Sequence, residues 1–475
     1  MVFASPVFLF LFLPLLLVLH AGTPHAWRNG LLLAASLFFY AWGEIRFLWV
    51  MLLSIVANYG FGLAMARRPD SRALFVVATG ANLLLLAAFK YADFLVANVN
   101  RLGALAGLPV LPMPHVHLPI GISFFTFHSL SYLWDVRLGK VPAQRRLVDF
   151  ALYIALFPQL IAGPIIRYHY LAPQLAARTL DVDGAAEGIR RFVVGLAKKM
   201  LIANVVAVPV DAIYALPPGE ITAALAWFGA ACYMLQIYFD FSGYSDMAIG
   251  LARLFGFVFP ENFAYPYVAT SITDFWRRWH ITLSTWFRDY LYVPLGGNRT
   301  GAARTYRNLA TVFFLCGLWH GASWTFVVWG LYHGAFLILE RTPFGRLLQR
   351  TPRVVQHAYA SLVVLVGWVF FRADSWPQAA AMLRAMVGLG AAESVQFHVA
   401  LYADHLVLLA MAAGIVAATP LAPAARASLA RLKERAPQHA LVGEFVGFAA
   451  VAGLFLLAAA RLAAGTYNPF IYFRF

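Results

Sequence analysis

Long apolar stretches recur along the chain and are separated by short polar or basic segments. A helix needs about 20 mostly apolar residues to cross the core of a bilayer, and lipid accepts apolar side chains on every face of it. The pattern therefore predicts an all-α polytopic membrane protein with about eleven transmembrane helices, several of them short or broken. The predicted spans are 2–20, 28–43, 45–66, 73–96, 118–135, 148–166, 189–214, 221–239, 308–340 (two elements), 357–372, 396–419 and 441–464.

No long polar linker or fixed-period repeat interrupts this pattern, so residues 1–475 are predicted to form one membrane-embedded domain. The first stretch has no Lys or Arg before Arg28. Because a secretory signal begins with basic residues, this stretch is predicted to be the first transmembrane helix. The two cysteines, Cys232 and Cys316, lie within apolar stretches and imply neither a disulfide framework nor a Cys-based metal motif.

Composition and charge agree with a membrane protein. Hydrophobic residues make up 62% of the chain and charged residues only 12%, whereas about 25% is usual in soluble proteins. The net charge of +15 comes from basic clusters between apolar stretches, which is the pattern of cytoplasmic loops. Nucleic-acid binding is not predicted, because the sequence contains no basic soluble domain. Counting back through three spans from the first cluster places the N-terminus outside the cytoplasm. The clusters contain Arg67, Arg68 and Arg72; Arg137, Lys140, Arg145 and Arg146; and Arg277, Arg278, Arg288, Arg299, Arg304 and Arg307.

The segment 262–307 combines basic and aromatic side chains. Its arginines, among them Arg277 and Arg278, are too costly to place in lipid, so the segment is not a span. Rings such as Trp276 and Trp279 suit the headgroup boundary, where one end is wet and the other apolar. We predict a basic amphipathic helix at the cytoplasmic interface, which either anchors the protein or admits an anionic, acyl-carrying donor.

His320 follows a short apolar stretch, 308–319. About twelve residues rise about 18 Å, too little to cross a core about 30 Å thick. Gly321 and Ser323 then loosen the backbone. His320 is therefore predicted to lie at a helix break inside the membrane, where an ionisable residue indicates a functional site. A neutral imidazole there can take a proton from a hydroxyl at physiological pH.

Two further histidines accompany it. His333 lies thirteen residues after His320 and would fall on another face of a continuous helix, so it is either functional or a buried imidazole bonded to a carbonyl. His280 by itself indicates an interfacial histidine, and the remaining histidines, near span ends or loops, are interpreted as structural. The chain has no His-Glu-x-x-His motif, Walker loop or Gly-x-Ser-x-Gly elbow, so no metal is predicted and any chemistry rests on imidazole.

Two acids lie in an otherwise apolar stretch, Asp240 and Asp246. A carboxylate at membrane depth should face a cavity or a cation. The candidate cations are Lys198, Lys199 and Arg253. Asp240 has two possible roles: it forms an ion pair that fixes helix packing, or it takes part in substrate binding.

At these residues the chain resembles the bacterial membrane-bound O-acyltransferases, and within them most closely the alginate O-acetyltransferases. The resemblance is dense over about 236–340, the expected catalytic core, and the order of spans fits over most of the chain. The similar stretches are YFDFSGYSDMAIGLARLFGF, NFAYPYVATSITDFWRRWHITLSTWFRDYLYVPLGGNR, GLWHGASWTFVVWGLYHG and the closing NPFIYFRF.

The resemblance implies a catalytic pair. His320, in a Trp-His-Gly context, matches the essential histidine of the family, and His280 matches its second polar active-site position. The implied fold is a ring of tilted helices around a central funnel with re-entrant segments, which receives the donor from one side and the acceptor from the other. Residues expected to contact the donor or substrate are Trp276, Arg277, Arg278, Trp279, Trp319 and Asp240.

The expected activity is transfer of acetyl groups from a cytoplasmic acyl thioester, such as acetyl-CoA, across the bacterial inner membrane toward an exported polysaccharide such as alginate, without a bound cofactor. The expected partners are a periplasmic or membrane-anchored acetyltransferase, the polysaccharide acceptor and the lipid bilayer. Peptidoglycan, cellulose and teichoic acid remain alternative polymers. Two other classes stay open: a transporter of an anionic polymer or lipid, and a scaffold with inert histidines.

Overall fold

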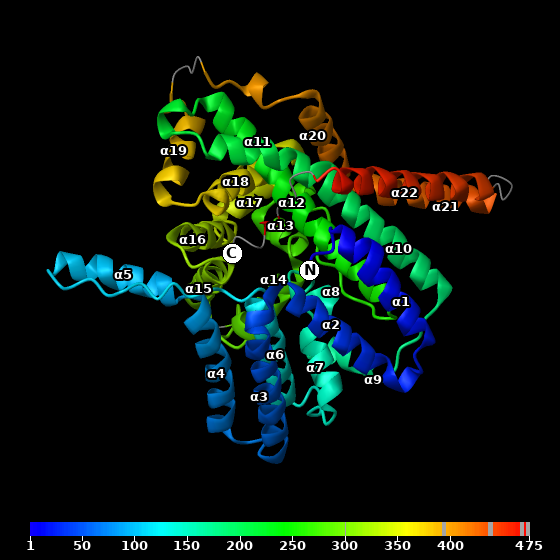
Figure 1. Ribbon diagram of the computed structural model, residues 1–475. Coiled ribbons are helices and arrows are strands. Elements are labelled where there is room, and N and C mark those ends of the chain that lie inside the picture. Colours follow the sequence, from blue (N-terminus) through cyan, green and yellow to red (C-terminus); the bar gives the residue numbers. More distant parts are fainter. Residues whose placement is uncertain (300, 392–395, 436–439, 466–469, 472–475) are drawn as a thin grey trace.

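The computed structural model describes residues 1–299, 301–391, 396–435, 440–465 and 470–471, and these residues form helices joined by loops. Figure 1 shows the helices packed around a centre near which both ends of the described chain lie. The predicted all-α class is confirmed for this part of the chain. Of the closing motif 468–475, only Phe470 and Ile471 are among the described residues.

The first part of the chain folds into helices at one end of the molecule. Helices α3, α4 and α6 lie side by side there, and α5 projects away from the body (Figure 1). A π-helical turn, Phe8–Phe12, precedes α1. The helices are α1 (Leu13–Gly22), α2 (Arg28–Glu44), α3 (Leu48–Arg67), α4 (Arg72–Lys90), α5 (Ala92–Leu105), α6 (Ile122–Arg137), α7 (Leu147–Ala155), α8 (Phe157–Leu160) and α9 (Tyr168–Ala176).

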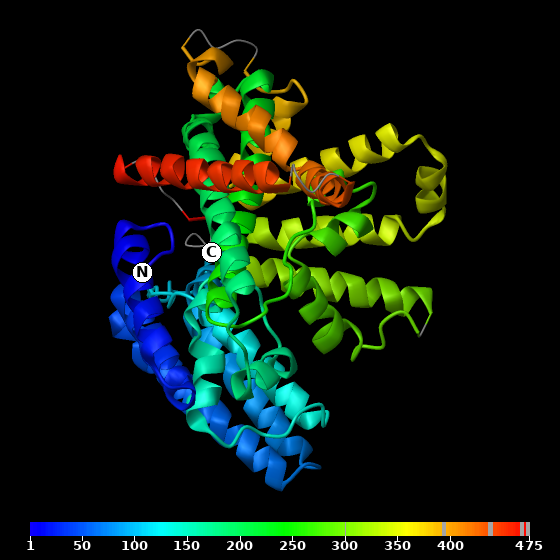
Figure 2. The same cartoon turned by 90° about the vertical axis from the view of Figure 1, so that its right-hand side faces the viewer.

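The second part supplies the long central helix and the stack that carries the candidate site. Helix α12 packs along α10, and α15, α16 and α18 lie next to one another (Figure 2). A π-helical segment, η4 (Lys198–Ala203), joins α10 to α11. The helices are α10 (Val182–Ala197), α11 (Asn204–Tyr214), α12 (Ala223–Leu254), α13 (Ile272–Arg278), α14 (Ile281–Phe287), α15 (Ala302–His320), α16 (Trp324–Leu339), α17 (Pro343–Arg350), α18 (Arg353–Arg372), α19 (Trp376–Met386), α20 (His405–Ala417), α21 (Leu421–Arg435) and α22 (Ala440–Ala463).

Helices α10 and α12 approach closely because glycines face each other along the contact. A Cβ added at Gly243 would lie 2.7 Å from the carbonyl oxygen of Gly195, and one added at Gly250 would lie 2.6 Å from that of Gly188. Side chains at these positions would force the helices apart, so the small residues set the distance between the two backbones.

Five helical stretches within the described residues are long and apolar enough to cross a membrane, and three shorter apolar helices accompany them. Their lengths and composition are those of a multi-pass membrane protein. The five are 25–67, 72–90, 182–214, 353–372 and 442–463, and the shorter ones are 8–22, 324–339 and 405–417.

Several predicted boundaries were wrong. The span 73–96 ends at Lys90, where α5 begins in a new direction, and the span 148–166 breaks at Leu156 between α7 and α8. The span 221–239 continues to Leu254, and the acids along its second half, Asp240 and Asp246, are paired with cations inside the protein. Apolar runs alone do not reveal such internal pairing.

Candidate active site

His320 is the last residue of α15, and Gly321–Ser323 separate it from α16. The predicted helix break is therefore confirmed. Helix α15 is longer than predicted, because its polar first turns from Ala302 onward are helical as well. The two helices form a tight hairpin, since a Cβ at Gly317 would collide with the backbone carbonyl of Phe326.

The open C-terminus of α15 is held by residues at the end of α4. The Tyr91 hydroxyl donates to the Leu318 carbonyl at 2.8 Å, and the Lys90 ammonium donates to the Trp319 carbonyl. Lys90 also donates to Ser123 Oγ at 3.3 Å. A cation at a helix C-terminus satisfies unpaired carbonyls and complements the helix dipole. Lys90 was missed, although a lysine inside a predicted span is itself a signal of function.

The imidazole of His320 lies in an aromatic surround and is 3% exposed. Its ring centroid is 4.8 Å from Trp319, 4.9 Å from Trp329 and 5.2 Å from Phe371. Neither ring nitrogen has a hydrogen-bond partner among the described residues. Since buried polar atoms are nearly always bonded, both nitrogens are suited to a reacting hydroxyl.

A cavity of about 310 Å³ adjoins this helix break. It is lined by Gly321 and Ala322, by Lys90, and by Phe371, whose ring contacts His320. One aromatic side chain therefore contacts both the cavity and the imidazole.

His280 lies between α13 and α14 in a left-handed backbone conformation, with φ of 42°. Its Nδ1 is 3.0 Å from Asn262 Oδ1, which also accepts from the hydroxyl of Thr282 at 2.8 Å and from its backbone N–H at 3.3 Å. A backbone N–H can only donate, so this bond fixes the Asn262 amide with its oxygen toward His280. His280 therefore carries its proton on Nδ1 and presents a lone pair on Nε2.

The two histidines flank one indole. The Trp319 ring is 6.1 Å from His280 and 4.8 Å from His320. Asn262 further donates to Ser245 Oγ on α12 at 3.0 Å, so the central helix helps to hold the His280 side of the site. Asn262 was not identified from sequence. The structure brings together His280, His320 and Trp319 of the predicted residues.

The aromatic residues of the 262–307 segment were misplaced by sequence reasoning. Trp276 and Trp279 are 7% and 2% exposed, so they are packed inside the protein and do not anchor it at the headgroup boundary. The ring centroid of Trp276 is 5.7 Å from that of Trp329, and the ring centroid of Trp279 is 4.8 Å from that of Trp368. Their pattern was ambiguous because a ring suits a protein core as well as an interface.

The flanking arginines remain at the surface. Arg277 is exposed, and Arg278 pairs with Asp274 at 2.9 Å and donates to the Ala264 carbonyl at 3.2 Å. Ser271 caps α13 by accepting from the Asp274 N–H at 3.0 Å. One long amphipathic helix was expected here, but two short helices separated at His280 are present.

Asp240 is buried and fully engaged by the chain. One carboxylate oxygen accepts from Lys199 at 2.6 Å, and the other accepts from the Ile471 N–H at 2.8 Å. Asp246 pairs with Lys198 and Arg191. The predicted cations Lys198 and Lys199 are therefore correct. Arg253 is not, because it lies 3.9 Å from Asp181 and from Glu187 instead. These contacts favour the helix-packing interpretation of Asp240.

His333 is completely buried, and its ring contacts Trp329, which also contacts His320. Its ring packs against Trp276 at 5.3 Å, and its Nε2 lies close to the backbone of Gly367. No hydrogen bond to a carbonyl accompanies it within the described residues. The predicted carbonyl partner is therefore not found in this part of the chain.

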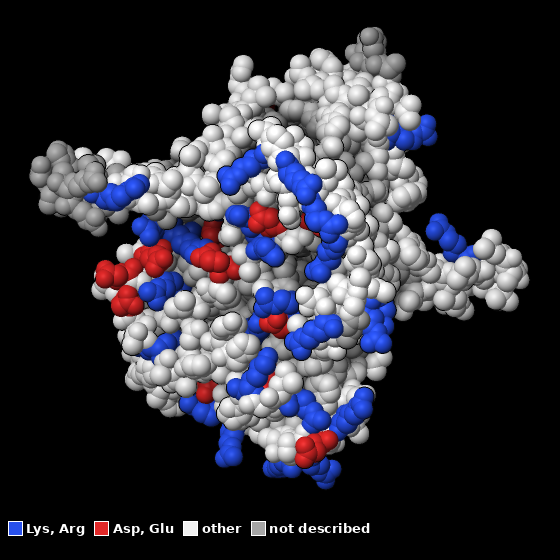
Figure 3. Space-filling view, turned by 180° about the vertical axis from the view of Figure 1, so that it is seen from behind, with Lys and Arg blue, Asp and Glu red and all other residues white. Residues whose placement is uncertain are grey.

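Basic side chains gather on one face of the molecule (Figure 3). Near it, Asp289 pairs with Arg167 at 2.6 Å and with Arg288 at 2.6 Å. Burial alone would raise the pKa of Asp289, but the hydrogen bond from Arg288 and the charge of Arg167 lower it below its ordinary value. The exposed basic residues of the predicted loops are Arg67, Arg68, Arg72, Lys140, Arg145, Arg146, Arg277, Arg288, Arg299, Arg304 and Arg307.

Residues 37–371 match the MBOAT, membrane-bound O-acyltransferase family. The chain is 44% identical to the probable alginate O-acetylase AlgI of Azotobacter vinelandii over 100% of both chains. It is 46% identical to the protein of the same name from Pseudomonas aeruginosa, over 82% of this chain and 75% of the relative. The peptidoglycan O-acetyltransferase of Helicobacter pylori is 36% identical over 82% of this chain and 80% of its own. The matched region includes both His280 and His320.

Proposed function

Because the chain belongs to the membrane-bound O-acyltransferase family and is an acyltransferase, we propose that it moves acetyl groups from a cytoplasmic thioester across the bacterial inner membrane toward alginate. The relatives with 44% and 46% identity carry the name alginate O-acetylase, which supports this polymer over others. The observation that carries the site is His320 at the helix break, with both ring nitrogens unbonded within the described residues and a cavity beside it.

In the proposed reaction, the acceptor hydroxyl attacks the carbonyl carbon of the acyl thioester. His320 takes the hydroxyl proton as the new C–O bond forms, and the C–S bond then breaks. The imidazolium returns the proton to the leaving thiolate, so the enzyme ends unchanged. His280 accepts a hydrogen bond on Nε2 and orients the reacting groups, because Asn262 keeps its proton on Nδ1.

The donor is proposed to be acetyl-CoA or another acyl thioester that enters from the basic face. The exposed Arg277 supports this route, because a guanidinium pairs well with phosphate groups. Trp276 and Trp279 would form the inner wall of the donor path, and Trp319 would contact the acyl group between the two histidines. Asp240 is proposed to support the site by fixing α12 rather than by touching the donor.

The proposed setting is the bacterial inner membrane, with about eleven spans in a ring around a central funnel. Such a ring would let donor and acceptor meet at His320 from opposite sides. The proposed acceptor is a periplasmic or membrane-anchored acetyltransferase partner that passes the group to the polysaccharide. A second candidate, acetylation of peptidoglycan, is favoured by the relative from Helicobacter pylori with 36% identity.

The test is replacement of His320 by Ala in a strain that lacks the native gene. We expect the exported polysaccharide to lose its acetyl groups, measured by mass analysis, while the amount of protein in the membrane stays normal. His25→Ala, at an exposed loop position, is the control and should keep acetylation. Retained acetylation in the His320 variant would exclude this assignment, and acetyl loss from peptidoglycan instead would support the second candidate.

A further inference from the structure

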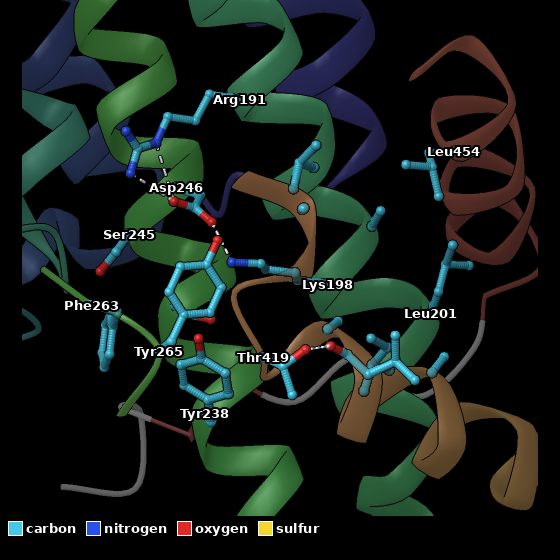
Figure 4. A pocket seen from close by; sticks show the side chains of 18 of the residues that line it. Arg191, Lys198, Leu201, Tyr238, Ser245, Asp246, Phe263, Tyr265, Thr419 and Leu454 are labelled. Atoms are coloured by element: carbon cyan, nitrogen blue, oxygen red, sulfur yellow. Dashed lines mark hydrogen bonds and ion pairs between the residues drawn. The ribbon is translucent and has the colours of Figure 1, made fainter. Parts of the chain in front are cut away.

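A second and larger cavity, of about 1310 Å³, lies away from His320. It separates the body of the protein, formed here by α10, η4 and α12, from the peripheral helices α20 and α22. Figure 4 shows charged side chains on one side of it and leucines on the other. The proposed acetyl transfer does not use this cavity.

The wide part of the cavity is apolar. Body and peripheral helices both contribute aliphatic side chains to it, and the apolar segment 442–463 of α22 is only 6% buried, as expected of a helix that faces lipid. An apolar space of this size beside the bilayer favours hydrocarbon over water, because exposed apolar surface in water is costly. The aliphatic lining includes Leu201, Val205, Leu409, Ala413, Leu454 and Leu457.

One end of the cavity is charged. Arg191 bridges Asp246 at 3.0 Å and Glu261, and Lys198 donates to Asp246 at 2.6 Å (Figure 4). These contacts form a network in which both acids are already neutralised by the cations beside them. The network therefore holds no spare negative charge that would repel an anion.

One further cation at this end favours an anion. Arg190 lines the cavity and makes no ion pair with a described carboxylate. Counting every charged residue of the lining, four are basic and three are acidic. A basic pocket next to membrane helices on the positively charged side is the usual setting for an acidic lipid headgroup.

We propose that this cavity binds one anionic glycerophospholipid, with its acyl chains between the body and α20–α22 and its phosphate at Arg190. An apolar chamber with a basic end matches the two halves of such a molecule. Asn262 and Ser245 also line the cavity, and Asn262 holds His280, so the bound lipid lies one residue away from the candidate active site.

The test is native mass spectrometry of the purified full-length chain titrated with phosphatidylglycerol and, separately, phosphatidylethanolamine. We expect one phosphatidylglycerol per chain and weaker binding of phosphatidylethanolamine. Arg190→Gln should weaken phosphatidylglycerol binding about fivefold, the effect of one basic residue near a headgroup. Ala413→Trp should weaken binding, because the indole occupies part of the apolar space that the acyl chains would take.

Matched controls separate the site from general effects. Arg101→Gln on α5 makes the same change as Arg190→Gln elsewhere, and Leu84→Trp on the exposed face of α4 introduces a Trp elsewhere; both should bind like the wild type. Unchanged phosphatidylglycerol binding in Ala413→Trp would overturn the site, and equal binding of the two lipids would overturn its preference for an anion. His320→Ala should bind lipid normally, so the outcome does not depend on the proposed acetyl transfer.

Discussion

At the scale of single residues, the candidate site depends on one amide that fixes one imidazole. Asn262 Oδ1 accepts from His280 and from both groups of Thr282, so the amide cannot turn without losing these bonds. The left-handed backbone at His280 stores strain that the surrounding contacts must offset. Strain and a fixed tautomer in one residue are typical of a position selected for function.

Replacing Asn262 by Leu should therefore lower acetyl transfer about 10- to 100-fold, the usual effect of removing a residue that orients a functional histidine. Asn262→Asp keeps an oxygen for His280 and Thr282 and should retain more activity than the Leu variant. Thioester loss in purified protein gives the rate, and thermal unfolding checks that both variants fold. Equal activity of the two variants would show that the His280 tautomer does not matter.

The ion pairs of Asp289 predict a pH dependence. The pKa of Asp289 is lower in the folded protein than in the unfolded chain. The ionised carboxylate therefore stabilises the fold fully above the ordinary Asp pKa, and this stabilisation is lost as the pH falls through the lowered pKa of the folded protein. Between about pH 5 and about pH 2, the wild type should lose more thermal stability than Asp289→Asn, which has no such charge to lose. Scanning both proteins in detergent gives the comparison, and parallel curves would contradict the prediction.

At the scale of elements, the site depends on how α15 ends. Lys90 and Tyr91 on α4 bond the last carbonyls of α15, and this places His320 at the turn to α16. Lys90→Met keeps the length of the side chain but leaves the Trp319 carbonyl without its partner. We expect the free energy of unfolding to fall by about 1–3 kcal/mol. We also expect the rate of thioester turnover to fall, because His320 is no longer held in place at the end of α15.

Two controls accompany this variant. Tyr91→Phe removes the weaker of the two caps and should have a smaller effect, and Arg101→Met, at an exposed position on α5, should have none. If Lys90→Met matched the wild type in both stability and turnover, α15 would not need this cap.

The hairpin of α15 and α16 gives a second test at this scale. A methyl group at Gly317 would collide with the Phe326 carbonyl, so Gly317→Ala should destabilise the protein by about 1–3 kcal/mol, as overpacking does. Gly60→Ala on α3 meets nothing within 4 Å and is the control. Thermal unfolding of both variants should separate them, and equal midpoints would show that the hairpin can widen freely.

Some features of these helices could be predicted from the sequence and others could not. Apolar runs predicted most helices, because a bilayer imposes length and composition on each span. The span 221–239 was nevertheless predicted to end before Asp240, although Lys199, which pairs with Asp240, was among the candidate cations. Trp276 and Trp279 were placed at the interface, although only the fold decides whether a ring meets lipid or another ring. His280 and His320 were singled out as candidates because their motifs are long, whereas Lys90 and Asn262 are single residues.

At the scale of the whole molecule, charge and shape together suggest one orientation. Many basic side chains lie on the face that Figure 3 shows, and the positive-inside rule places basic loops in the cytoplasm. The α3–α4 loop with Asp70 and the loop before α15 with Arg299 should then lie in the cytoplasm. Helix α4 leads from that side to the other, so the segment after α5, which includes Leu108, should lie outside.

Single cysteines test this orientation. In a background of Cys232→Ala and Cys316→Ala, both buried sites, Asp70→Cys, Arg299→Cys and Leu108→Cys place one exposed thiol each. A membrane-impermeant maleimide added to intact spheroplasts should label only Leu108→Cys, and lysis should expose the other two. Labelling of Arg299→Cys in intact spheroplasts would put the basic face outside, where no cytoplasmic thioester could reach it. The proposed direction of acetyl transfer depends on this result, because His320 can connect the two compartments only if the donor enters from the basic face.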